Sequence, residues 1–165
     1  MGSDNPKWRE KIELTFEEYI RNQQSRVIEL ARELEEEIGK NKTLEIIGQL
    51  YEKKEVKSVK ELLHEKPINS MDDFIAFHED VLRKRRAYSF EMELIKPSKL
   101  VVHTTSCIYA KVCRELDAVE LGYTMNCATD FALAQVFNPN LRLERTMTLM
   151  QGDPYCNFEW IWEEE

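Results

Sequence analysis

Hydrophobic residues in the first part of the chain recur every three to four positions, which is the spacing of an amphipathic helix. The first such stretch begins near Phe16 and ends at Gly39 and Asn41, residue types that commonly terminate helices. The same spacing predicts a second, short helix over residues 44–50 and a third over residues 59–64. This part of the chain therefore reads as helical.

A further helix is predicted after Pro67. Ser70 precedes it, and Asp73 stands three residues later, which is an acidic variant of the capping box that begins many helices. Its apolar stripe consists of Phe74, Phe77, His78, Val81 and Leu82. Residues 1–86 are therefore predicted to form a helical scaffold.

The hydrophobic pattern changes its period after this scaffold. Apolar and polar residues alternate strictly over residues 88–94, which is typical of a strand with one buried face. A similar alternation, with one exception in each segment, predicts strands over residues 141–149 and 156–162. Residues 104–118 and 120–136 return to helical spacing. The order of helices, then strand–helix–helix–strand–strand, predicts an α+β fold with an antiparallel sheet packed on helices.

Length and composition narrow the class of protein. A chain of 165 residues has the length of one domain, so residues 1–165 are predicted to fold together, with residues 87–165 supplying the sheet. The 42% of hydrophobic residues argue against disorder, and no apolar run is long enough to span a bilayer. The N-terminus lacks the apolar segment of a secretory signal, which favours a cytoplasmic location.

The charge of the chain is acidic and uneven. The net charge is −8, and residues 101–165 hold four basic against ten acidic residues. Nucleic-acid binding requires a basic face that displaces counterions, so a nucleic-acid partner is not expected. A small molecule is the expected partner, and whether the chain forms a homodimer stays open.

All four cysteines lie in the last 65 residues, at Cys107, Cys113, Cys127 and Cys156. No pair has the CxxC spacing of a zinc ribbon or a thioredoxin-type site, and free thiols are expected in a reducing compartment. Cys113 follows Cys107 by six residues, about 120° around a helix. Cys113 is therefore predicted to lie apart from the others. It is also predicted to be structural, because a buried free cysteine most often acts as a small apolar residue.

Three features single out the C-terminal half as a candidate site. Cys156 falls on the apolar face of its predicted strand and so points inward. Cys127 and Asp130 are three residues apart on a predicted helix, which makes them neighbours on one face. Arg145 occupies an inward position between two apolar residues, and a buried charge requires a partner: Asp130, Glu159 or an anionic ligand.

The C-terminal stretch resembles the L-2-amino-thiazoline-4-carboxylic acid hydrolase family over about residues 101–162. The motifs that carry the resemblance run in order along the chain: Cys107-Ile108-Tyr109-Ala110, Arg114-Glu115-Leu116, Glu120-Leu121-Gly122, Cys127 with Asp130, Asn138-Pro139, Arg145-Thr146, and Gly152-Asp153 with Cys156 and Phe158. Two positions depart from the family pattern. Tyr155 stands where a His is common, and Asn126 replaces a second cysteine before Cys127.

The resemblance implies a reaction in which water opens a 2-aminothiazoline ring, whose cyclic amidine is basic. The catalytic candidates are Cys107, Cys127, Asp130 and Cys156, with Asp130 orienting the amidinium cation. Arg145 would grip the substrate carboxylate, and Tyr109 and Trp160 are further candidates for substrate contacts.

Two alternatives remain open. Cys107, Cys127 and Cys156 could instead bind zinc, with a metal-bound water as the nucleophile. The element order is also similar to small-molecule-binding domains of the vinyl-reductase type, so a non-catalytic binding or sensor domain is the second functional reading.

Overall fold

The computed structural model describes residues 13–83 and 87–163, and its N-terminal part consists of two long helices, α1 (Phe16–Ile38) and α2 (Lys40–Glu65). Thr15 begins α1 with a capping box, in which its hydroxyl accepts the Glu18 N–H and the Glu18 carboxylate accepts the Thr15 N–H. Gly39 separates the two helices with a φ of +83°, a conformation that glycine adopts without steric cost.

The two short helices predicted at residues 44–50 and 59–64 are parts of one helix, so that prediction was wrong. The intervening residues 51–58 hold mostly lysine and glutamate and contain neither proline nor glycine, so nothing in them stops a helix. Their hydrophobic stripe is weak because much of this stretch faces solvent. Apolar spacing alone therefore missed the continuity of α2.

Helix α3 (Met71–Phe77) follows the break at Pro67 and leads into a π-helical turn, η2 (His78–Leu82). The Ser70 hydroxyl accepts the Asp73 N–H at 3.2 Å, which confirms the predicted cap. His78 is buried, and its Nδ1 lies 3.0 Å from the Phe74 carbonyl oxygen.

The sheet has four antiparallel strands in the order β1-β2-β4-β3, namely β1 (Tyr88–Lys96), β2 (Lys99–Cys107), β3 (Leu141–Glu144) and β4 (Cys156–Trp162). The α+β class with an antiparallel sheet is therefore confirmed.

Strand β2 was missed, because residues 104–107 were predicted to be helical. Its β-branched residues, among them Val101, Val102 and Thr104, are the signal that favours a strand there. β1 and β2 form a hairpin, so the strand predicted over residues 88–94 has its partner next to it in the chain.

Three short helices connect β2 to β3: α4 (Ile108–Glu115), α5 (Val119–Asn126) and α6 (Thr129–Phe137). The single helix predicted over residues 120–136 is therefore two helices that meet at Cys127 and Ala128.

Strand β3 is shorter than the predicted strand over residues 141–149. It stops at Glu144, and a 3₁₀ turn, η4 (Leu149–Gln151), follows. The reason lies in Asn157, whose side-chain oxygen accepts the backbone N–H groups of Thr146 and Met147. These amides are thereby satisfied by a side chain instead of by the neighbouring strand.

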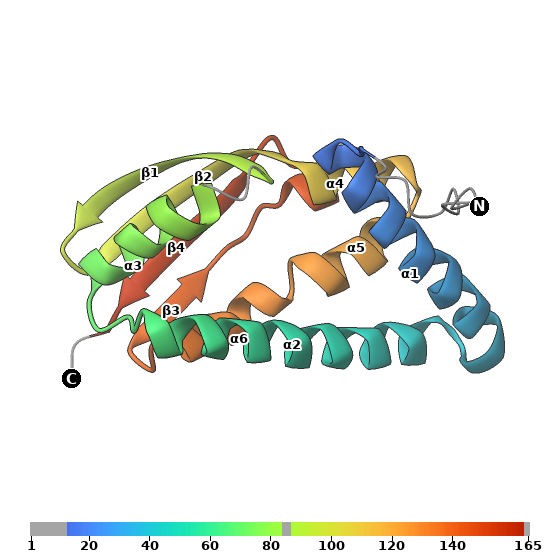
Figure 1. The fold of residues 1–165 in the computed structure, drawn as a ribbon, viewed down its shortest axis with the longest axis horizontal. Coiled ribbons are helices and arrows are strands. Elements are labelled where there is room, and N and C mark those ends of the chain that lie inside the picture. The colour runs from blue at the N-terminus through green and yellow to red at the C-terminus, as the bar shows by residue number, and fades with distance from the viewer. Residues whose placement is uncertain (1–12, 84–86, 164–165) are drawn as a thin grey trace, which may run out of the picture.

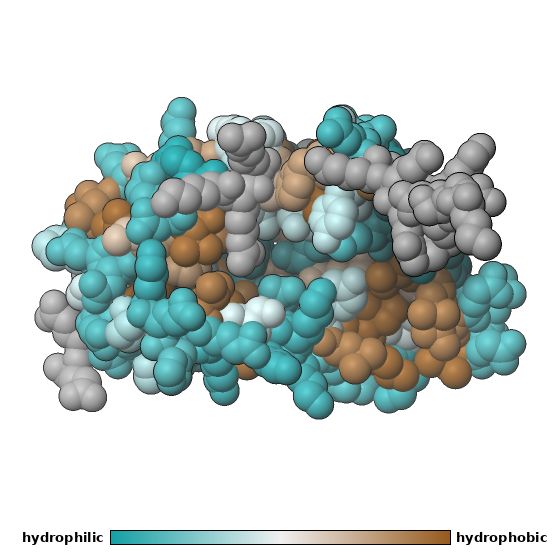
Figure 2. Space-filling view, in the orientation of Figure 1, coloured by the Kyte–Doolittle hydropathy of each residue, from teal (hydrophilic) through white to brown (hydrophobic). Residues whose placement is uncertain are grey.

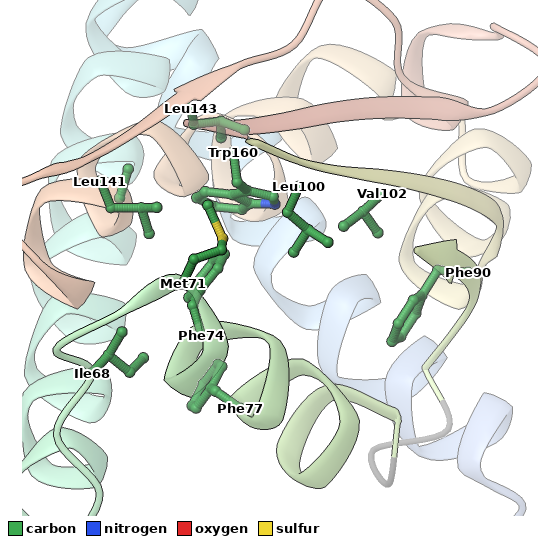
Figure 3. Close-up of a cluster of buried hydrophobic side chains, with 11 residues drawn as sticks. Ile68, Met71, Phe74, Phe77, Phe90, Leu100, Val102, Leu141, Leu143 and Trp160 are labelled. Carbon is green, nitrogen blue, oxygen red and sulfur yellow. The ribbon is translucent and has the colours of Figure 1, made fainter. Parts of the chain in front are cut away.

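The main core lies between α3 and the inner face of the sheet. Figure 3 shows Phe74 of α3 directed toward Trp160 of the sheet, and Phe77 belongs to the same buried cluster and packs against Phe137 of α6. Phe74 is fully buried, and its ring meets Trp160 edge-on with 4.8 Å between the ring centroids.

A second helical layer continues this core. Helix α2 runs along α6 and α5, and α1 crosses α2 and α4 (Figure 1). The opposite face of the sheet bears charged side chains instead, among them Glu91, Glu93, Arg142 and Glu144. The helices therefore cover one face, and residues that point inward from the sheet meet α3 and α6.

The surface is mainly hydrophilic, with hydrophobic side chains gathered toward the end where α1 meets α2 (Figure 2). Exposed apolar side chains of these two helices include Leu30, Ile38 and Leu50. Within the described ranges 13–83 and 87–163, no helix combines the length and the apolar character that crossing a bilayer requires.

Gly122 allows α5 to approach α4 and η4 closely. A Cβ at this position would lie 2.7 Å from the Cβ of Cys113 and 2.8 Å from the sulfur of Met150, both of which are fully buried. We expect Gly122→Ala to lower the free energy of unfolding by about 1–3 kcal/mol, since the packed core must shift.

Gly48→Ala is the matched control in a urea unfolding titration. Its added Cβ would meet only a methyl group of Thr124, at 3.1 Å, and alanine is the better helix former by about 1 kcal/mol. We therefore expect a change near zero for Gly48→Ala. Equal losses in the two variants would contradict the close packing at Gly122.

Candidate active site

Arg145 lies just beyond β3 and points to the interior. Its side chain is only 1% exposed, as the alternation with buried Leu141 and Leu143 predicts. Beyond the end of β3, the side-chain oxygen of Asn157 accepts the backbone N–H groups of Thr146 and Met147, the two residues that follow Arg145. These hydrogen bonds fix the backbone next to Arg145, whose side chain points inward as in the strand. The predicted burial of Arg145 is confirmed.

The guanidinium of Arg145 is held by one carboxylate and one carbonyl. Nη1 donates to Oδ2 of Asp130 at 2.5 Å, and Nη2 donates to the carbonyl oxygen of Cys127 at 2.9 Å. The expected pairing with Asp130 is therefore confirmed. Three aromatic rings surround the cation, with centroids 4.9–5.9 Å from Cζ, a range that permits cation–π attraction: Phe158, Phe131 and Tyr123.

Asp130 is the partly accessible member of this pair. Its side chain is 27% exposed, and it lies in the first turn of α6. Burial raises the pKa of Asp130 to about 6, although the positive charge of Arg145 and its hydrogen bond act in the opposite direction. A carboxylate with a pKa of about 6 is ionised near neutral pH and can still exchange a proton there.

Cys127 lies next to Asp130, but on a different helix from the one expected. Cys127 ends α5 and Asp130 belongs to α6, and the Asp130 N–H donates to the Cys127 carbonyl oxygen at 3.2 Å. The turn between α5 and α6, and not one continuous helical face, brings them together. Burial raises the pKa of the Cys127 thiol, and the negative charge of Asp130 acts in the same direction.

Cys107 ends β2, directly precedes α4, and is partly buried. Burial raises the pKa of its thiol to about 11, while backbone N–H groups of Ala110 and Tyr109 lower it by donating to the sulfur. Cys156 is buried on the inner face of β4, as predicted, and its sulfur accepts the Leu149 N–H at 3.3 Å. Burial also raises the pKa of the Cys156 thiol.

These thiols share their surroundings. The charge of Asp130 raises the pKa of Cys107, Cys127 and Cys156 alike, so the three lie within electrostatic range of one carboxylate. All four cysteines are free.

Cys113 was predicted to lie apart from the other thiols, and that prediction was wrong. Cys113 is completely buried in the same hydrophobic cluster against which Cys107 and Cys127 pack. The prediction assumed that Cys107 and Cys113 belong to one helix. Cys107 instead ends β2 and precedes α4, so the angular spacing of a helix does not apply to this pair. The Cys113 thiol lies 3.6 Å from the side-chain oxygen of Gln24, to which it donates, and burial raises its pKa to about 11.

Zinc binding by three cysteines was the alternative considered from the sequence. Across residues 13–83 and 87–163, no group of three or more His, Cys, Asp or Glu side chains is arranged to hold a metal ion. The thiols are close enough to influence one another but do not form such a ligand set.

The two aromatic candidates lie in different places. Tyr109 packs beside Cys107 and faces Tyr88, with 6.0 Å between ring centroids. Trp160 instead belongs to the main core, where it stacks on Phe158. The structure therefore brings Tyr109, but not Trp160, into the cluster around Cys107.

Tyr155, which departs from the family pattern, lies just before β4 and packs against His103, with 4.9 Å between ring centroids. His103 is exposed, and Tyr155 directly precedes the inward-pointing Cys156. Neighbouring residues of a strand point to opposite faces. Tyr155 is thus placed on the outer side of the sheet, away from Asp130.

An open cleft of about 600 Å³ lies where the β1–β2 hairpin meets α4. Its polar lining consists of Ser89, Ser106, Cys107, Lys111, Arg114 and Glu115. Sequence reasoning gave Arg114 no function beyond its place in a family motif. It also missed Ser89 and Ser106, because the strand that brings Ser106 opposite Ser89 was not predicted.

Residues 19–160 match the sequence model of a family described as L-2-amino-thiazoline-4-carboxylic acid hydrolase. The match covers most of the chain and includes the N-terminal helices, beyond the C-terminal motifs in which the resemblance was first seen. A comparison with curated proteins finds no match.

Proposed function

Because the chain belongs to the L-2-amino-thiazoline-4-carboxylic acid hydrolase family, we propose that it hydrolyses a C–N bond of a cyclic amidine, with L-2-amino-thiazoline-4-carboxylate as the first substrate to test. The observation that carries the proposal is the Asp130–Arg145 pair. It places a partly accessible carboxylate among aromatic rings and neutral thiols, next to the α5–α6 turn.

The substrate's basic ring supports a pairing with Asp130. A protonated amidine is a planar cation whose N–H groups can donate to a carboxylate. Oδ2 of Asp130 accepts from Arg145, and no other described residue donates to Oδ1. Oδ1 is therefore the atom proposed to accept from the amidinium.

The proposed reaction balances with one water molecule. The water oxygen forms a bond to the amidine carbon and becomes the carbonyl oxygen of the product, the bond between that carbon and the ring nitrogen breaks, and both protons of the water go to the leaving nitrogen. Asp130, with a pKa of about 6, can carry these protons one at a time from the oxygen to the nitrogen. The raised pKa values of the cysteine thiols keep them protonated near pH 7, which favours water over a thiolate as the nucleophile.

Arg145 is proposed to position Asp130 instead of gripping the substrate carboxylate, which was the role expected from the sequence. Both of its terminal nitrogens are already engaged, and its side chain is almost fully buried. The engaged guanidinium of Arg145 holds the Asp130 carboxylate in one position. Its positive charge also keeps the pKa of Asp130 from rising further.

The pH dependence of hydrolysis tests this proposal. If the ionised Asp130 is the active form, kcat/KM should fall about tenfold per pH unit below pH 6 and level off above it. The ring-opening rate can be followed from pH 4.5 to 10. A rate that keeps rising through pH 9 would contradict the water mechanism and indicate attack by a thiolate.

A further inference from the structure

The cleft beside α4 has a cation whose charge is not balanced within it. Lys111 donates to both carboxylate oxygens of Glu17, at 2.8 and 2.7 Å, and Glu115 pairs with Arg21. No carboxylate of residues 13–83 and 87–163 lies within ion-pair distance of Arg114. The described part of the cleft therefore presents Arg114 as its uncompensated positive charge.

The Arg114 side chain is held in place, and most of its N–H donors remain available to a ligand. Its Nη1 donates to the carbonyl oxygen of Leu149 at 3.3 Å, and Leu149 itself lines the cleft. This contact anchors the guanidinium at the wall of the cleft and occupies one of its five N–H donors. The remaining donors suit a carboxylate, which an arginine can bind in a bidentate manner.

Arg114 and Cys107 both line this cleft. Cys107 lies where β2 ends and α4 begins, and Arg114 lies in the last turn of α4. Long helical side chains lean back toward the helix N-terminus, which is the Cys107 end of α4. A cleft of about 600 Å³ has room for a small ring that bears a carboxylate.

Behind Cys107 lies the site already described. Cys107 and Cys127 pack against the same buried cluster, and the pKa of the Cys107 thiol is raised by burial and, less strongly, by the charge of Asp130. Cys107 is thus the residue of the cleft wall that connects it with the surroundings of Asp130.

We propose that Arg114 binds the carboxylate of the ring substrate in this cleft and so selects anionic cyclic amidines over uncharged ones. This inference rests on the proposed hydrolase function for the identity of the substrate. Ser89 and Ser106, paired across the β1–β2 hairpin at the same cleft, supply further hydroxyl donors for a carboxylate.

The test compares two substrates and three variants. L-2-amino-thiazoline-4-carboxylate and 2-aminothiazoline differ only in the carboxylate. For Arg114→Ala we expect KM for the carboxylated substrate to rise at least about tenfold with little change in kcat, because a contact made equally in ground and transition states is lost. Kinetics with 2-aminothiazoline should be unchanged, and Arg114→Lys should be intermediate.

Arg142→Ala is the matched control, since it removes one arginine from the outer face of the sheet, where Arg142 pairs with Glu144 and Glu163. It should leave both substrates unaffected. Equal KM values for native protein and Arg114→Ala, or equal losses with both substrates, would overturn the proposal.

A binding measurement separates this inference from the proposed reaction. L-thiazolidine-4-carboxylate has the ring and the carboxylate but no amidine, and its Kd can be measured by calorimetry without turnover. We expect Arg114→Ala to weaken its binding about tenfold or more, and thiazolidine itself to bind poorly to both proteins. If the native protein binds the probe through Arg114 but hydrolyses neither substrate, the hydrolase proposal fails alone; if the probe binds equally well to the variant, the Arg114 proposal fails alone.

Discussion

Replacing Asp130 by asparagine is expected to lower kcat for ring opening at least about 100-fold. Asparagine keeps the size of the side chain and an oxygen that can accept from Arg145, but it removes the negative charge that would hold an amidinium and accept a proton. Losing such a charge from a site shielded from water costs several kcal/mol of transition-state stabilisation. Steady-state kinetics at pH 8, where native Asp130 is fully ionised, would measure the loss.

Asp117→Asn provides the matched control for this change. Asp117 is exposed and has a φ of +51°, a backbone conformation that asparagine adopts readily. Both variants should remain folded by circular dichroism, and only Asp130→Asn should lose activity. Undiminished turnover in Asp130→Asn would remove Asp130 from the mechanism.

Replacing Arg145 by leucine is expected to lower the free energy of unfolding by roughly 3 kcal/mol. Removing one partner of a buried ion pair leaves the other charge uncompensated, and it also ends the contacts of the guanidinium with Phe158 and Phe131. The partial exposure of Asp130 places the expected loss at the lower end of the range for buried pairs. Urea unfolding at pH 7 would measure it.

A second readout distinguishes positioning from mere stabilisation. Arg145 lowers the pKa of Asp130, so its removal should move the acidic limb of the residual pH–rate profile above pH 6. Arg142→Leu, which removes an exposed arginine, should change stability by less than about 0.5 kcal/mol and leave the profile in place. A profile unmoved in Arg145→Leu would contradict the role given to this residue.

The alternation of apolar residues was sufficient to orient the most important side chains. It placed Cys156 and Arg145 on the inner face of the sheet, and both are buried there. It also identified the Ser70 cap, because capping depends on residues close together in the chain. Local patterns thus predicted the strand faces and a buried Arg145 that needs a partner, and the structure identifies Asp130 among the partners considered.

Features that depend on contacts between distant residues could not be predicted in the same way. Strand β2 has a mixed composition, and its identity depends on neighbours on both sides, β1 and β4. The burial of Cys113 near Cys107 follows from the turn of the chain at the end of β2. The engagement of the second terminal nitrogen of Arg145 depends on the carbonyl of Cys127, and a backbone group leaves no signal in the residue pattern.

The identity of the cation that faces the substrate carboxylate shows the same limit. Arg114 and Arg145 both stand within the family motifs, and the sequence led us to expect only Arg145 to bind the substrate carboxylate. Only the tertiary contacts show that Arg145 is buried and engaged with Asp130, whereas Arg114 is exposed at an open cleft. For this reason we propose that Arg114, and not Arg145, contacts the substrate carboxylate.

The most direct test of the account is to incubate the purified native protein with L-2-amino-thiazoline-4-carboxylate at pH 8 and follow the ring by NMR. We predict that the ring signals disappear, that a ring-opened product containing one added water appears at a rate proportional to protein concentration, and that Asp130→Asn prevents it. Saturable binding without any ring opening would contradict the hydrolase proposal and favour a ligand-binding or sensor domain on the same fold.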